Sequence, residues 1–273
     1  MKWPNGMSSW WGKAIGGGVG YLMGGYLGAL IGAVIGHQVD KGSTDYEIDE
    51  DFSPGAQTRV QTAFFTATFS VLGHLAKADG RVSEQEIAFA REVMRQFSLN
   101  EGQKQVAIEL FNKGKETGFD LYEALRDLKR ECLRRQNLLQ TFLEIQIQAV
   151  LADGEIHDRE RLLLLNIGSA LGFNRDQLDA VIGQIVGAQR FHSSRTGHSS
   201  KTQLQAAYET LGVKASDDDE TIKKAYRRLM AQHHPDKLVA QGLPEEMMKE
   251  VTARAQSIQD AYQLIKKHRG NDG

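Results

Sequence analysis

An uncharged stretch near the N-terminus limits what this chain can fold into more than any other feature does. Residues 14–36 contain no acidic or basic side chain. At about 1.5 Å rise per residue, a helix of this length covers the roughly 30 Å hydrocarbon core of a bilayer. The tail before it, residues 1–13, carries aromatic and cationic residues of the kind that anchor a membrane helix at the interface: Trp3, Trp10, Trp11, Lys2 and Lys13. We therefore predict a transmembrane helix over 14–36. The alternative is a cleaved signal peptide, whose apolar segment would be shorter and followed by a small-x-small cleavage site.

Glycines recur at every fourth position of this segment. They are Gly16, Gly20, Gly24, Gly28, Gly32 and Gly36. On a helix this spacing forms one slowly rotating stripe without side chains, along which two backbones can approach closely inside lipid. The stripe predicts a homodimer joined through the membrane helix. The alternative is that glycine is simply frequent in membrane helices.

Composition excludes several other classes of protein. Cys132 is the one cysteine of the chain, which rules out an internal disulfide framework and a cysteine-based zinc module. The formal net charge is -2, so no global charge favours nucleic acid as a partner. A basic run over 126–135 is interpreted as a solvated helix face. An acidic linker is predicted over 37–55.

The middle of the chain repeats itself. Residues 78–80 read Ala-Asp-Gly, and the same three residues return at 152–154. The offset, 152 − 78 = 74, also maps Asn100 onto Asn174. Apolar residues in both copies have helical rather than alternating spacing. The sequence predicts a duplicated all-α domain over 56–188.

The two Asp-Gly segments, each followed by a glutamate, resemble the TerB-like family of all-helical domains. This resemblance implies that acidic residues could group into a divalent-metal site, made of Asp79, Glu86, Asp153 and Glu160. The alternative, which we favour, is that each aspartate ends one helix and each glutamate caps the next. An EF-hand calcium loop is rejected because its first and third ligand positions fall on residues without side-chain oxygens: Leu75, Lys77, Ala149 and Leu151.

After a segment over 189–203 with the composition of a flexible linker, the pattern predicts short helices over 204–273. Ser216 and Asp219 have the spacing of a capping pair at the start of one helix. Its apolar stripe leaves a basic face directed outward, made of Lys223, Lys224, Arg227 and Arg228.

Proline disfavours helix at the residue before it, so this helix is predicted to end at the tripeptide His234-Pro235-Asp236, called HPD below. Another helix is predicted to start near Pro244. Together the two helices form an antiparallel hairpin whose connecting loop carries HPD.

Four blocks of this region closely resemble the J-domain family and stand in family order. They are Tyr208-Glu-Thr-Leu-Gly-Val213, Ile222-Lys-Lys-Ala-Tyr-Arg-Arg-Leu229, His234-Pro-Asp-Lys237 and Asp260-Ala-Tyr262. The resemblance implies that the basic face docks on an acidic surface of a DnaK-type chaperone, while HPD triggers ATP hydrolysis there. One departure is apparent extra length over Val239–Met248.

The whole chain thus resembles membrane-anchored DnaJ-like co-chaperones. We expect a single-pass protein of the cell inner membrane with its N-terminus periplasmic and its folded domains cytoplasmic. Lysine and arginine counts around the membrane helix alone would favour the opposite orientation. We expect a non-enzymatic regulator without a cofactor, apart from the metal considered above, that acts in envelope stress signalling. The alternative function is a metal-responsive TerB-like sensor or scaffold that uses the J-domain as its output.

Overall fold

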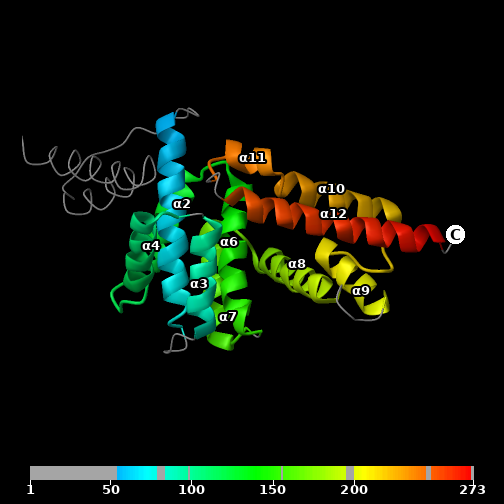
Figure 1. The fold of residues 1–273 in the computed structure, drawn as a ribbon, viewed down its shortest axis with the longest axis horizontal. Helices are drawn as coiled ribbons and strands as arrows, with labels where there is room; N and C mark the ends of the chain where they lie inside the picture. The colour runs from blue at the N-terminus through cyan, green and yellow to red at the C-terminus, as the bar shows by residue number, and fades with distance from the viewer. Residues whose placement is uncertain are drawn as a thin grey trace, which may run out of the picture.

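The protein is helical throughout the part that the computed structural model describes, which is residues 54–78, 84–97, 99–154, 156–194, 200–243 and 247–271. No strand occurs among these residues, so the all-α prediction is confirmed. The elements in chain order are α2 Pro54–Leu75, α3 Glu84–Gln96, α4 Glu101–Gly114, α5 Leu121–Glu131, α6 Gln136–Val150, the 3-10 turn η1 Leu151–Asp153, α7 Asp158–Leu171, α8 Arg175–Ser194, α9 Ser200–Leu211, α10 Asp219–Gln232, α11 Pro235–Ala240 and α12 Met248–Asn271 (Figure 1).

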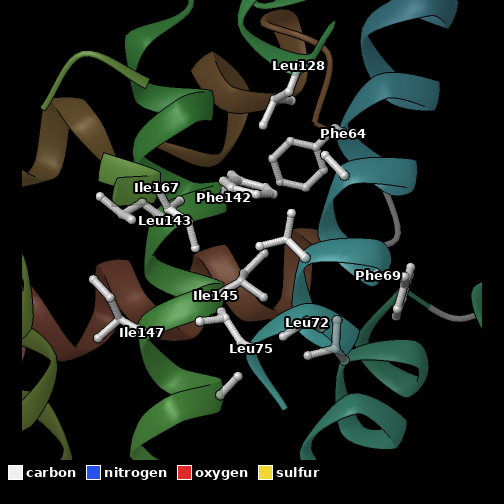
Figure 2. Close-up of a cluster of buried hydrophobic side chains, with 14 of the residues drawn as sticks. Phe64, Phe69, Leu72, Leu75, Leu128, Phe142, Leu143, Ile145, Ile147 and Ile167 are labelled. Carbon is white, nitrogen blue, oxygen red and sulfur yellow. The ribbon is translucent and has the colours of Figure 1, made fainter. Parts of the chain in front are cut away.

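Helices α2 and α6 form the centre of the first helical unit. Their large apolar side chains point toward each other, as Figure 2 shows for Phe64 and Phe142. Both rings are fully buried and meet edge to face, with centroids 6.2 Å apart and an interplanar angle of 79°. Helices α4 and α5 pack against α2, and α3 and α7 pack against α6. Helix α8 contacts α6 and runs from this bundle toward α9 (Figure 1). No helix among the described residues is both long and apolar enough to cross a membrane, and the glycine-striped segment 14–36 lies outside them.

The duplication is visible in the helix boundaries. Helix α3 starts at residue 84 and α7 at 158, and α4 starts at 101 and α8 at 175, so both pairs differ by 74 residues. The helices α4 and α8 also begin with the same reciprocal cap. The Gln103 N–H donates to Asn100 Oδ1 at 3.0 Å, and the Gln177 N–H donates to Asn174 Oδ1 at 2.9 Å. Each glutamine side chain in turn accepts from the asparagine N–H.

Helix α8 differs from the sequence prediction because it continues into the range expected to be a flexible linker. It runs to Ser194, and α9 begins at Ser200, so 189–203 is helical at both ends; residues 195–199 are not described. The reason is packing. Phe191 near the end of α8 is buried in the core of the C-terminal hairpin, whereas Leu178 and Ile185 of the same helix belong to the core of the first unit. Helix α8 therefore contributes side chains to both cores.

Candidate functional site

The C-terminal unit is an antiparallel pair, α10 and α12, with α9 packed across it (Figure 1). Its core includes Ile222, Leu229, Ile258 and Ile265, all at most 2% exposed. Beside them the rings of Tyr226 and Tyr262 stack, with centroids 4.2 Å apart. The apolar stripe of α10 therefore faces α12, as its spacing predicted.

The start of α10 differs in detail from the prediction. Asp218, not Ser216, is the N-cap residue, and its Oδ1 accepts from the Thr221 N–H at 2.6 Å. Hydrogen bonds from the side chain and then the backbone N–H of Thr221 lower the pKa of the Asp218 carboxyl, because they favour its charged form. Ser216 lies in the preceding turn, which the Lys214 N–H closes by donating to Asp217 Oδ2.

The outer face of α10 is basic. The buried residues Ile222, Ala225 and Leu229 face the core. The opposite side of the helix carries four exposed cationic side chains: Lys223, Lys224, Arg227 and Arg228. The structure thus places these predicted residues together on one solvent-facing surface. We call this surface the basic face.

The HPD tripeptide directly follows α10. His233 ends that helix, and His234 has extended backbone angles, φ −68° and ψ 121°. Pro235 then occupies the first position of the short helix α11, where a missing N–H costs nothing. His234 and Asp236 are exposed and Pro235 is half-buried. The imidazole and the carboxylate are therefore open to a partner at the end of the basic helix. Helix α11 itself was not predicted.

Arg269 holds the far end of the hairpin together, a role that the sequence analysis missed. Its guanidinium donates to Tyr208 Oη at 3.0 Å, to Asp219 Oδ1 at 2.7 Å, and to the carbonyl oxygens of Ala215 and Asp217, both at 2.7 Å. One side chain of α12 thereby fixes α9 and the start of α10. An arginine near the end of a helix carries no local signal for such a role.

His233, the residue before the tripeptide, was also missed. It is 3% exposed, and its Nε2 lies 3.5 Å from Oε1 of Glu144 on α6. Burial lowers the pKa of His233, which outweighs the opposite effect of Glu144, and the nearby Arg254 lowers the pKa further. The ring is thus held in its neutral form against the first helical unit.

The proposed metal ligands are only partly placed. Glu160 is buried, and its Oε2 accepts from the His157 N–H at 2.8 Å, as a capping glutamate does. Glu86 is half-buried on α3, whereas Asp79 and the side chain of Asp153 lie outside the described residues. No cluster of three metal-ligating side chains occurs within the part of the chain that is described. A metal site in this domain stays a prediction.

Cys132 is fully buried after α5, and burial raises the pKa of its thiol to about 12. Such a thiol stays protonated at neutral pH and packs as a small apolar group. Cys132 is therefore part of the core of the first helical unit.

Comparison with protein families matches three segments of the chain. Residues 7–46 match the family described as the co-chaperone DjlA transmembrane domain. Residues 65–182 match the tellurite resistance protein TerB family, and residues 206–270 match the DnaJ domain. The first match covers the glycine-striped segment, the second lies within the duplicated helices, and the third contains the basic face and HPD.

Relatives named "Co-chaperone protein DjlA" align along most of the chain. The one from Aliivibrio fischeri is 44% identical, covering 95% of this chain and 98% of the relative. The one from Coxiella burnetii is 43% identical, covering 96% of this chain and 98% of the relative. The one from Photorhabdus laumondii is 42% identical, covering 86% of this chain and 88% of the relative. No solved structure gives a significant match. With this identity along nearly the whole length, the chain belongs to the DjlA family of J-domain co-chaperones.

Proposed function

We propose that this protein stimulates the ATPase of a DnaK-type chaperone from a membrane anchor. The single observation that carries the proposal is the exposure of His234 and Asp236 at the end of a helix whose outer face is basic. The match of residues 206–270 to the DnaJ domain supports a DnaK-type partner, and so does the name of the relatives, which are called co-chaperones. The chain would act as a regulator of its partner's hydrolysis and not as an enzyme of its own.

The two parts of the site would have separate roles. The basic face would attract an acidic surface of the partner, which speeds encounter and makes binding sensitive to salt. HPD would contact the partner at the point that controls hydrolysis. Pro235 restricts the backbone between His234, the N-cap residue of α11, and Asp236 in its first turn, so the two polar side chains have a defined geometry.

The test is the steady-state ATPase rate of a DnaK-type chaperone with the full chain in detergent micelles. His234→Gln should abolish stimulation, because glutamine lacks the imidazole ring. His192→Gln is the matched control, since His192 is exposed on α8, and it should stimulate like the native chain. Equal stimulation by His234→Gln and the native chain would refute the proposal.

We further propose that the chain is a single-pass protein of the inner membrane with its folded domains in the cytoplasm, where an ATP-driven chaperone acts. The match of residues 7–46 to a transmembrane family supports the anchor. A role in envelope stress signalling would follow from a chaperone being recruited to that membrane.

The glycine stripe is proposed to join two copies within the membrane. Replacing both Gly24 and Gly28 with Leu adds side chains to the stripe, so it should abolish self-association in a membrane two-hybrid assay. Replacing Leu22 and Leu30 with Ile serves as a control off the stripe. Association that survives the glycine substitutions would exclude this interface.

A further inference from the structure

The segment that follows HPD packs into the first helical unit rather than into the hairpin. Leu238, Leu243, Met247 and Val251 are each at most 4% exposed, and they belong to the same buried cluster as Phe64 and Phe142. The core of the hairpin is a separate cluster. Leu243 and Met247 lie within the apparent extra length Val239–Met248, so part of that length packs the hairpin onto the TerB-like domain.

A polar contact fixes the position of this docking segment. The Arg135 guanidinium, at the start of α6, donates to the carbonyl oxygen of Gln241 at 3.0 Å. Gly242, which follows, has φ +99°, and a Cβ there would lie 2.9 Å from Cγ1 of Val60 on α2. The end of α11 therefore sits against α2 and α6 in one defined place (Figure 1).

The other side of HPD is anchored to the same unit. His233 is buried beside Glu144, which is itself 5% exposed. Gln140 Nε2 donates to Glu144 Oε1 at 2.9 Å. Arg254 of α12 faces them across a cavity of about 30 Å³ whose lining also includes Met247 and Val251. Residues directly before and shortly after HPD are thus both fixed by helices of the TerB-like domain.

This docking leaves the functional surface open. His234, Asp236 and the basic face are exposed, while His233 before them and Leu238 after them are buried. An inhibitory contact would cover these groups. The observed contact instead involves residues that flank HPD in the chain. The arrangement therefore fits a role in orienting HPD.

We propose that the TerB-like domain positions the HPD tripeptide for the chaperone, with Glu144 and Arg135 as positioning residues. The inference rests on the proposed ATPase stimulation and adds that the J-domain hairpin does not set the geometry of HPD alone. Loosening the contact between the hairpin and the TerB-like domain would lower the rate of ATP hydrolysis in the bound complex, because the groups that trigger hydrolysis would be misplaced. Binding would persist, because the basic face is unchanged.

The test measures the ATPase rate of a DnaK-type chaperone against the concentration of the full chain. Glu144→Ala and Arg135→Ala should each lower the maximal stimulated ATPase rate about three- to tenfold. The concentration of the chain that gives half-maximal stimulation should change little. Glu144→Gln keeps an acceptor of the same size beside His233 and should retain most of the native rate. Arg126→Ala, an exposed arginine on α5, is the matched control.

Amide hydrogen exchange separates positioning from general destabilisation. Glu144→Ala and Arg135→Ala should speed exchange over 235–243 and leave α9 unchanged, because only the docking contact is weakened. Native maximal rates and native exchange in both variants would overturn the inference. So would a rise in the half-maximal concentration with an unchanged maximal rate. A native chain that gives no stimulation would instead overturn the proposed function itself.

Discussion

Single side chains connect helices in this protein that are far apart in the chain. Arg269 is the clearest example, since its guanidinium donates to one phenol oxygen, one carboxylate and two backbone carbonyl oxygens. Hydrogen bonds from a charged donor are stronger than neutral ones. The contacts also close the turn before α10, on which the position of the basic face depends.

Arg269→Ala should therefore lower the free energy of unfolding by about 2 kcal/mol, because it removes four hydrogen bonds from a charged donor that join α12 to α9 and to the start of α10. Urea denaturation followed by circular dichroism measures the change. Lys266→Ala is the control, because Lys266 is exposed on the same helix. An Arg269→Ala variant as stable as Lys266→Ala would show that the four contacts contribute nothing.

At this scale the sequence reveals local patterns and misses distant partners. HPD and the four cations of α10 are recognised because a few neighbouring residues define them. The burial of His233 depends on Glu144, and the role of Arg269 depends on Tyr208, and both partners lie on helices distant in sequence. No spacing rule relates such pairs, so only the folded structure brings them together.

At the scale of helices, close approach of backbones determines how the units join. Helices α8 and α9 approach closely at Gly187, where a Cβ would lie 2.6 Å from the Thr210 backbone nitrogen. Nearby, Arg190 of α8 and Glu209 of α9 form an ion pair, with Arg190 Nη1 3.3 Å from Glu209 Oε2. Gly187 thus allows the J-domain hairpin to lie directly on the last helix of the TerB-like domain.

Gly187→Ala should lower the free energy of unfolding by about 1–3 kcal/mol, because the added methyl group meets backbone atoms that cannot move independently. Gly183→Ala on the same helix is a matched control, since nothing lies within 4 Å of its Cβ position. That control should be neutral or stabilise by up to about 1 kcal/mol, as alanine favours helix over glycine. Equal thermal shifts for the two variants would contradict the close packing of α8 and α9.

The duplicated helices were predictable because caps and apolar spacing are local, and the offset of 74 residues appears again in the starts of α7 and α8. The extent of α8 was not predictable. Its last turns are polar except for Phe191, and the apolar residues that cover this ring come from another unit. Helix α11 was missed for a similar reason, since Leu238 packs outside the hairpin.

In the whole molecule, the hairpin is attached to the TerB-like domain at two places. Helix α8 carries α9 at one, and the segment after HPD packs against α2 and α6 at the other (Figure 1). HPD lies at the second of these attachments, where His234 and Asp236 remain exposed. Helix α8 thus extends to Ser194, into the range expected to be a flexible linker, and places Phe191 in the core of the hairpin.

The exposed groups of HPD are proposed to trigger ATP hydrolysis on a bound chaperone. Single-turnover ATP hydrolysis by a DnaK-type chaperone, at saturating concentrations of the full chain, isolates this step. We expect the native chain to accelerate hydrolysis and Asp236→Asn, which keeps the shape of the side chain and removes its charge, to leave the rate unaccelerated. Equal acceleration by Asp236→Asn and the native chain would show that the Asp236 carboxylate is not required.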